Sequence, residues 1–411
     1  MEKRVVVTGY GVVSPIGNNV DTYWENMQNG VSGIDHIKAF DNTGFDVKFS
    51  AEVKDFVPKY LDRKEQQRFE KFCQYAMEAS GEAIEQSGLD IEKIDQNEFG
   101  VIIGTGIGGL ESIEKNTMIC KEKGQSKVSV LFIPQIIVNM VSGSVAIKYG
   151  AKGSVYSPVT ACATGTNSIG EAFRSIKHGY HKVMLAGGSE SSITPTGAAG
   201  FTNLKAMSKA DEMNRASVPF DKERSGFVIG EGAGILLLEE LEYAKARGAN
   251  ILGEIVGYGS TCDAYHITSP DLEGEGARRA MENAIKEAGI NCENVGYINA
   301  HGTSTPINDK VETKAIKDLF KDYAYKLNVS STKSMLGHGL GAAGGLEAVA
   351  CLLALKDGSI PPTINYKVKD EECDLDYTPV TVKKNIQYAL SNSLGFGGHN
   401  AVLCFKKWED K

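Results

Sequence analysis

The chain has 411 residues, of which 42% are hydrophobic and 23% charged, and its formal net charge is −8. This composition is typical of a globular protein with a large core, and the acidic balance argues against a nucleic-acid-binding protein, which would carry a clustered basic excess. No apolar run approaches the roughly 18 residues that a membrane-spanning helix needs, so we expect no membrane association.

Strand-like and helical segments alternate along the chain. Short apolar runs predict strands at residues 4–8, 101–104 and 182–186. Helical periodicity predicts helices at residues 67–87 and 168–178. This alternation predicts an α/β protein with buried, largely parallel sheets.

Two segments of the N-terminal part recur, in the same order, in the C-terminal part. Thr8-Gly-Tyr-Gly returns as Val256-Gly-Tyr-Gly, each behind a short apolar strand. The helix end Ala83-Ile-Glu-Gln-Ser-Gly returns as Ala284-Ile-Lys-Glu-Ala-Gly. The repeat favours two homologous halves, although glycine after a helix is common enough for chance similarity to stay open. These halves are residues 1–250 and residues 251–411.

The glycine-rich segment Gly104-Thr-Gly-Ile-Gly-Gly formally matches the phosphate-binding pattern of dinucleotide-binding proteins. No following strand ends in the Asp or Glu that would bind the ribose, so the match is incomplete. We interpret the segment as a close-packed turn that lines a pocket at Ile107.

The eight cysteines are dispersed, with no C-x-x-C pair and no zinc-type spacing, which indicates free thiols in a reducing cytoplasm. Cys162 differs from the others because small residues surround it directly before a predicted helix. A thiol at a helix N-terminus faces unpaired N–H groups, so we expect a lowered pKa and a nucleophile. A small buried hydrophobic residue is the alternative.

A nucleophilic cysteine needs polar partners, and two of the seven histidines lie in glycine-flanked loops at apparent strand ends. They are His301 and His338, and Lys333 precedes the second by five residues. Ligand sites gather at such strand ends in open α/β sheets, which favours these two histidines as site residues. The histidines expected to be solvated on the surface are His36, His178 and His181.

An ordered set of motifs across the whole chain resembles the elongating β-ketoacyl-acyl-carrier-protein synthases of the thiolase superfamily. The motifs are Val5-Val-Val-Thr-Gly-Tyr-Gly, Gly104-Thr-Gly-Ile-Gly-Gly, Thr160-Ala-Cys-Ala-Thr-Gly, Pro219-Phe-Asp-Lys-Glu-Arg, Gly230-Glu-Gly-Ala-Gly, Asp263-Ala-Tyr-His-Ile-Thr-Ser-Pro, His301-Gly-Thr-Ser-Thr-Pro, Lys333-Ser-Met-Leu-Gly-His and Asn392-Ser-Leu-Gly-Phe-Gly-Gly. The resemblance implies an α/β fold of the thiolase type, with five layers, α-β-α-β-α, made from two duplicated halves.

The same resemblance implies a Cys-His-His site that condenses malonyl-carrier protein with an acyl chain held on Cys162. His301 and His338 would donate hydrogen bonds to the malonyl thioester oxygen, and Lys333 would support the site electrostatically. The backbone N–H groups of Cys162 and Phe396 would form the oxyanion hole. The glycines around Phe396 would let it act as a gate.

Substrate-binding positions are implied in the same way. Thr303 and Thr305 would contact the phosphopantetheine arm of the acyl carrier protein, and Phe201 would lie near the malonyl site. Ile107 would limit the acyl pocket, and Phe132 would reach that pocket from the second subunit of a homodimer. No cofactor is implied beyond the phosphopantetheine that carries the substrates.

Two further sites are expected. A basic patch would dock the acidic carrier protein, with an ordinary solvated helix face as the alternative. The patch is Lys64, Arg68 and Lys71. Some relatives hold a structural monovalent cation rather than a catalytic metal, near the positions of Asn299, Glu347 and Asn392.

Rival functions differ in their expected residues. A degradative thiolase would carry a second catalytic cysteine late in the chain, and an initiating synthase a Cys-His-Asn set, so the two histidine loops favour neither. A non-catalytic chain-length factor would lack the nucleophile, which disfavours that function. A ketosynthase of a polyketide pathway would use identical chemistry and stays the main alternative.

Overall fold

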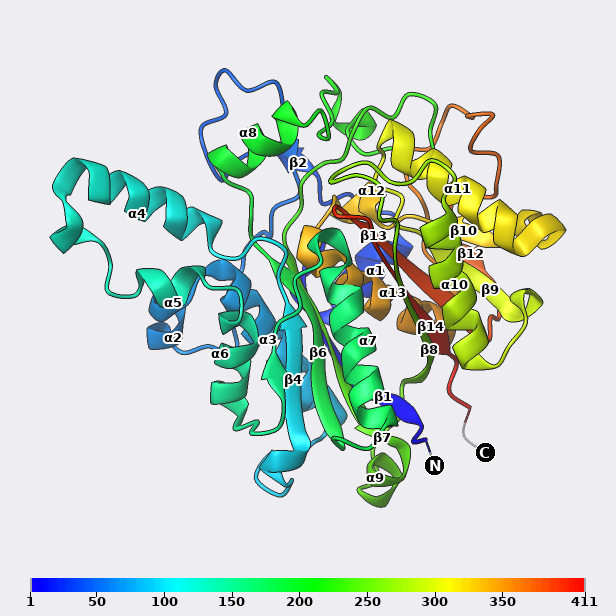
Figure 1. The fold of residues 1–411 in the computed structure, drawn as a ribbon, viewed down its shortest axis with the longest axis horizontal. Coiled ribbons are helices and arrows are strands. Elements are labelled where there is room, and N and C mark those ends of the chain that lie inside the picture. The colour runs from blue at the N-terminus through cyan, green and yellow to red at the C-terminus, as the bar shows by residue number, and fades with distance from the viewer. Residues whose placement is uncertain (1, 410–411) are drawn as a thin grey trace.

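The computed structural model describes residues 2–409; residues 1, 410 and 411, at the outer ends of the two predicted halves, lie outside the described residues. A large mixed sheet runs through the molecule (Figure 1). The first half of the chain supplies β1 (Val5–Val13), β4 (Phe99–Gly104), β5 (Val155–Tyr156), β6 (Val183–Glu190) and β7 (Gly232–Glu240). The second half supplies β8 (Gly253–Cys262), β9 (Val295–Asn299), β10 (Asn328–Ser330), β13 (Tyr388–Gly395) and β14 (His399–Lys406).

The strand order shows the duplication directly. The first half is ordered β1-β7-β6-β4-β5 and the second β8-β14-β13-β9-β10, so corresponding strands occupy corresponding places. The strand directions also match: two antiparallel pairs are followed by two parallel pairs in each half. The halves join where Val5–Val7 of β1 pairs with β8. Two duplicated halves are confirmed.

The expectation of largely parallel sheets is wrong, because the last strands of each half, β7 and β14, run antiparallel to both neighbours. Antiparallel strands need no crossover helix, so an apolar run alone does not reveal strand direction. The predicted boundary between residues 250 and 251 lies between α9 (Leu241–Ala246) and β8. The boundary itself stays a prediction.

Helices cover both outer faces and fill the space between the two halves of the sheet (Figure 1). The outer layers are α3 (Lys71–Ser87) with α6 (Met140–Tyr149), and α10 (Glu275–Ala288) with α11 (Pro306–Phe320). The middle layer is α7 (Thr164–Lys177) and α13 (Ala343–Asp357). Every residue of α13 from Ala343 to Leu355 is buried, as expected for a helix that is apolar all round. These are the five layers of the predicted fold.

The repeated sequence segments form one helix-on-strand contact, built twice. A Cβ added to Gly9 in β1 would lie 2.0 Å from the carbonyl oxygen of Ala83 in α3. A Cβ added to Gly257 in β8 would lie 2.0 Å from the carbonyl oxygen of Ala284 in α10. Only a residue without a side chain lets the helix backbone come this close to the strand. Each Gly-Tyr-Gly motif therefore allows the backbone of a helix to pack directly on the strand.

One predicted helix differs from the structure. Residues 67–87 are divided between α2 (Arg63–Arg68) and α3, because Glu70 is extended and its carboxylate accepts a hydrogen bond from the Ser112 backbone N–H at 2.6 Å. The remaining helices are α1 (Val20–Gln28), α4 (Leu110–Lys123), α5 (Phe132–Ile136), α8 (Pro195–Asn203) and α12 (Lys333–Leu336). The short strands are β2 (Asp35–His36) with β3 (Phe49–Ser50), and β11 (Ser359–Ile360) with β12 (Val382–Lys383). Within residues 2–409, no helix combines the length and the apolar character required to cross a bilayer.

Candidate active site

Cys162 lies where the chain enters the central helix α7. It sits in a short 3₁₀ turn, Ala161–Ala163, and a second such turn, Leu340–Ala342, leads into α13. The first residue of each turn has a φ of 49°, a strained value for a residue other than glycine. The strained turn is therefore part of the duplicated architecture. Only the first copy carries a thiol, since Gly341 follows the strained residue in the second.

The two predicted histidines come together from separate loops. His301 follows the end of β9 by two residues, and His338 follows the end of α12 by two residues. Their ring centroids lie 5.3 Å apart, with the rings nearly perpendicular at 86°. The rings of Phe227 and His338 pack in a T-shaped arrangement, with their centroids 5.2 Å apart. Both histidines and Cys162 line one cavity of about 320 Å³.

Most of the predicted substrate residues line the same cavity. They are Phe201, Thr303, Thr305 and Phe396. The hydroxyl oxygens of Thr303 and Thr305 lie 2.9 Å apart at the start of α11. A paired hydroxyl at a cavity wall is suited to hydrogen bonding an extended amide-containing chain.

Two predicted residues lie outside the cavity wall. Ile107 packs against the apolar cluster that contains Cys162 but does not itself line the cavity. Phe132 begins α5 and does not line the cavity of its own chain. The expectation that Phe132 acts on a second subunit stays a prediction.

Both histidines are neutral at physiological pH. Burial, followed by the charge of Lys333, holds the pKa of each imidazole well below its usual value of 6.5. Within residues 2–409 neither Nδ1 atom has a hydrogen-bond partner, and both are buried. Nε2 is therefore the nitrogen of each ring that can serve the cavity, and the Nε2–H tautomer makes it an uncharged donor.

Lys333 does not line the cavity but forms a fully buried ion pair with Glu347. Burial raises the pKa of the Glu347 carboxyl to about 7, although the Lys333 charge opposes that rise. Because Lys333 lowers the pKa of both histidines without touching the cavity, its effect is electrostatic. This arrangement agrees with the expectation that Lys333 supports the site electrostatically.

The expected low pKa of Cys162 is wrong. Burial raises the pKa of the thiol to about 12, and the nearby Glu190 carboxylate raises it further. Lys333 and the backbone N–H groups of Phe396 and Cys162 oppose this rise without reversing it. Loss of water around the sulfur outweighs the favourable helix start. The resting residue is thus a thiol.

Two backbone donors converge on the sulfur. Phe396 lies in the turn between β13 and β14, directly after Gly395. A Cβ added to Gly395 would lie 3.2 Å from the backbone nitrogen of Cys162, so the two backbones are in contact. The N–H groups that act on the thiol are those expected to form the oxyanion hole.

The sequence did not reveal two buried carboxylates that hold the site loops. Glu312 in α11 accepts hydrogen bonds from the backbone N–H groups of His301 and Gly302, both at 2.8 Å. Glu190, at the end of β6, accepts from Gly106 at 2.8 Å and Gly341 at 3.2 Å. The glycine-rich segment therefore binds a carboxylate of the protein instead of a phosphate. The available signal was an acidic residue ending the apolar strand β6, beside two glycine loops.

The predicted cation position contains oxygen atoms that lack partners. Asn299 and Asn392 come from the paired strands β9 and β13. Among residues 2–409, Oδ1 of both and Oε2 of Glu347 are buried without a hydrogen-bond partner. Three buried oxygens without partners fit the ligand preference of a hard cation.

The predicted docking residues are exposed and lie away from the cavity. Lys64 and Arg68 are on α2 and Lys71 begins α3. The adjacent helix α5 is tied to α2 by a hydrogen bond from the Gln135 side chain to the Arg68 carbonyl, 3.1 Å long, and the two helices lie together at the left of Figure 1.

The prediction that His181 is solvated is wrong, whereas His36 and His178 are exposed as expected. The His181 ring accepts a hydrogen bond at Nε2 from the Ser154 backbone N–H, 2.9 Å away. Its Nδ1 lies 2.8 Å from the Ser175 hydroxyl. These two contacts hold the imidazole beneath the segment that leads into β5.

Comparisons with known proteins agree with this geometry. Residues 2–244 match the family model "Beta-ketoacyl synthase, N-terminal domain", and residues 252–367 match "Beta-ketoacyl synthase, C-terminal domain". A protein of Synechocystis sp. named 3-oxoacyl-[acyl-carrier-protein] synthase 2 is 53% identical over 411 residues, covering 99% of each chain. A Staphylococcus aureus protein of the same name is 52% identical over 409 residues, again covering 99% of each chain.

Solved structures match over the full length as well. One is described as a type II PKS acyl-carrier protein in complex with its ketosynthase bound to the hexaketide; it has a TM-score of 0.93 and 36% identity and covers 100% of both chains. Another is a beta-ketoacyl synthase from Burkholderia phymatum, with a TM-score of 0.92 and 34% identity, covering 99% of this chain and 100% of that one. With its duplicated fold, its Cys-His-His cavity and these full-length matches, the chain belongs to the β-ketoacyl synthase family.

Proposed function

We propose that the protein is an elongating 3-oxoacyl-acyl-carrier-protein synthase of fatty acid synthesis, which joins malonyl-carrier protein to an acyl chain held on Cys162. The observation that carries this proposal is one cavity lined by Cys162, His301 and His338. Relatives of that name are 52–53% identical over almost the whole chain.

The first step is acyl transfer. The Cys162 sulfur attacks the thioester carbonyl of the acyl-carrier protein, the carbon–sulfur bond to the carrier breaks, and the thiol proton leaves with the carrier's sulfur. The tetrahedral oxygen accepts hydrogen bonds from the backbone N–H groups of Cys162 and Phe396, whose closeness to the sulfur supports this step.

The second step is condensation. Malonyl-carrier protein loses CO₂, and the electron pair of the broken carbon–carbon bond forms an enolate. The neutral Nε2–H groups of His301 and His338 donate to its oxygen. The enolate carbon attacks the acyl carbonyl on Cys162, and the sulfur leaves and takes up one proton. The product is a 3-oxoacyl-carrier protein two carbons longer.

The other site residues have supporting parts. Lys333 keeps both imidazoles uncharged through its electrostatic field. Thr303 and Thr305 bind the phosphopantetheine arm, Phe201 faces the malonyl group, and Phe396 gates the cavity. The wall position of these last four residues supports their assignment.

The acyl pocket extends beyond the catalytic cavity. Ile107 limits it within the chain, and Phe132 limits it from a second subunit. A structural monovalent cation would be held by Asn299, Glu347 and Asn392, each of which has an oxygen without a hydrogen-bond partner in the described part of the chain. It would order the loops around Lys333 and supply no catalytic step.

Two partners are proposed, the acyl carrier protein and a second copy of the chain. The acyl carrier protein docks on Lys64, Arg68 and Lys71, which are exposed, and brings its phosphopantetheine to the cavity. The chain pairs with a second copy through the edge strand β5, whose Val155 and Tyr156 side chains are exposed. We place the enzyme in the cytoplasm, because its eight cysteines are free.

A polyketide-pathway ketosynthase is the second candidate, because a solved structure at 36% identity is described as a type II PKS acyl-carrier protein in complex with its ketosynthase. A chain-length-factor function is disfavoured because Cys162 is present. An assay with acyl-carrier proteins of graded chain length plus malonyl-carrier protein tests the proposal. Formation of 3-oxoacyl-carrier products from fatty acyl chains is expected. Absence of product with every chain length would overturn the proposed function.

A further inference from the structure

Arg224 is a buried cation that the reaction does not use. Its side chain is only 2% exposed, and it lies in the connection between α8 and β7, outside the cavity wall. A buried guanidinium is retained only where its donors find fixed acceptors. Where these acceptors lie shows what the residue holds in place.

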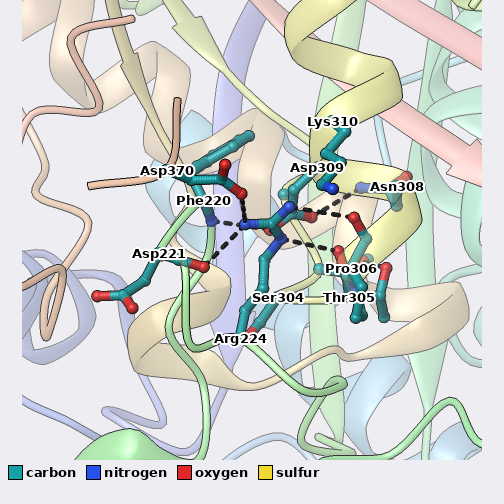
Figure 2. A network of polar contacts seen from close by, with 12 residues as sticks. Phe220, Asp221, Arg224, Ser304, Thr305, Pro306, Asn308, Asp309, Lys310 and Asp370 are labelled. Atoms are coloured by element: carbon teal, nitrogen blue, oxygen red, sulfur yellow. Dashed lines mark hydrogen bonds and ion pairs between the residues drawn. The ribbon is translucent and has the colours of Figure 1, made fainter. Parts of the chain in front are cut away.

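Two of the acceptors belong to the loop that carries the paired hydroxyls. The Arg224 Nε atom donates to the carbonyl oxygen of Thr305 at 3.2 Å, and an Nη atom donates to that of Pro306 at 3.1 Å. Figure 2 shows the guanidinium between these carbonyls and Asp370, whose carboxylate accepts at 2.7 Å. Asp309, fully buried in the first turn of α11, is 3.7 Å from Nε. The network therefore fixes the start of α11.

The backbone of the same loop explains why Thr303 and Thr305 both line the cavity. Ser304, between the two threonines, has a φ of 68°, in the left-handed region. Its hydroxyl accepts from the Val218 N–H at 2.9 Å, and its carbonyl accepts from the Gly226 N–H at 3.0 Å. Ser304 is held toward the Arg224 segment, while the flanking Thr303 and Thr305 line the cavity with their hydroxyls 2.9 Å apart.

The segment from Val218 to Gly230 also reaches the second histidine loop. The His338 N–H donates to the carbonyl of Val228, and the Gly230 N–H donates to the carbonyl of His338 at 2.9 Å. One segment from the first half of the chain thus holds both histidine loops, which the second half contributes to the cavity. Arg224 is its buried ionic anchor.

We propose that Arg224 is a positioning residue for the carrier-borne substrate, which sets the hydroxyls of Thr303 and Thr305 at the spacing that the phosphopantetheine arm requires. This inference rests on the proposed function. It predicts a change in substrate binding rather than in the reactivity of Cys162, because none of the Arg224 contacts reaches the sulfur.

The test compares steady-state kinetics of Arg224→Lys with those of the wild type. Lysine keeps the charge but cannot span both carbonyls and Asp370, so KM for malonyl-carrier protein should rise about tenfold or more. The kcat should stay within about threefold, and the rate of Cys162 alkylation by iodoacetamide should not change. Asp370→Asn should raise the same KM by less, and it provides the test if Arg224→Lys does not fold.

The control is Arg247→Lys, which disrupts another ion pair between an arginine and a carboxylate, outside the cavity wall. Arg247 pairs with the buried Glu239 and donates to the Ser87 carbonyl at 3.0 Å, so its loss should lower stability without changing KM. In a double-mutant cycle, the KM effect of Thr305→Val should nearly disappear in the Arg224→Lys background.

The outcomes separate the two proposals. An unchanged KM in both Arg224→Lys and Asp370→Asn, or additive effects in the cycle, overturns the positioning role of Arg224. The proposed function stands in that case if the wild type still catalyses condensation. Equal KM rises in Arg247→Lys would also overturn it, because general destabilisation would then explain the effect. A wild type that forms no 3-oxoacyl product overturns the proposed function and this inference together.

Discussion

The strongest quantitative prediction concerns the neutral histidine donors. His338→Ala should remove one of the two N–H donors that we propose stabilise the enolate formed when malonyl-carrier protein loses CO₂. Donors of this kind contribute about 2.7 to 4 kcal/mol in a site that excludes water, so decarboxylation should slow about 100- to 1000-fold. Water is a poor substitute here, because the vacated space borders the aromatic ring of Phe227.

The pH dependence gives an independent check on the same histidines. Burial and the Lys333 charge keep the pKa of both imidazoles well below 6.5, so neither gains a proton between pH 6.5 and 8. The wild-type decarboxylation rate should therefore stay constant over this range. Release of ¹⁴CO₂ from labelled malonyl-carrier protein measures it directly.

Two variants complete the experiment. Cys162→Gln should abolish condensation yet retain decarboxylation, and His178→Ala, at an exposed histidine, should leave both unchanged. Acyl transfer to Cys162 should survive in His338→Ala. A decarboxylation rate that climbs about tenfold per unit as the pH falls from 8 to 6.5 would refute the neutral-donor reasoning, because it would require a charged imidazole.

Three further outcomes are expected. Alkylation of Cys162 by iodoacetamide should keep accelerating above pH 9, since the pKa of the thiol is raised to about 12. Prior acylation of Cys162 should block its alkylation, while the exposed Cys262 still reacts. Peptide mass mapping shows which cysteine carries the label. Gly257→Ala should cost about 3 kcal/mol or more in urea unfolding, since its Cβ would lie 2.0 Å from a helix carbonyl, whereas Gly200→Ala, with open space around it, should be neutral or stabilising. Burial lowers the pKa of His181, so the unfolded state binds a proton more readily and the free energy of unfolding falls as the pH drops below 6.5. Between pH 7 and 5, His181→Gln should therefore lose less of its free energy of unfolding than the wild type. Equal losses in the two proteins would contradict this assignment.

That Cys162, His301 and His338 gather at one site could be predicted because their signals are local. Cys162 lies among small residues at a helix start, and His301 and His338 lie in glycine-flanked loops, which are features of short segments. The fold class and its duplication were predictable for the same reason, since each Gly-Tyr-Gly motif and each helix end is a short local pattern.

The errors concern interactions between distant segments. Glu312 and Glu190 act on backbone N–H groups contributed by other loops, which no local pattern reveals. The direction of β7 and β14 depends on how the chain returns to the sheet. Burial decided the remaining cases, because His181 and Cys162 lose their water only after other elements pack over them.

The burial of α13 between the two halves has a consequence for synthesis of the chain. This helix packs against β6 and β7 of the first half, yet its residues, Ala343–Asp357, are made about 100 residues after that half is complete. At a translation rate of about 5 to 20 residues per second, the part of the inner face that α7 does not cover waits roughly 5 to 20 s for α13. The nascent first half therefore exposes an apolar sheet face on the ribosome, where holding chaperones would have time to bind it.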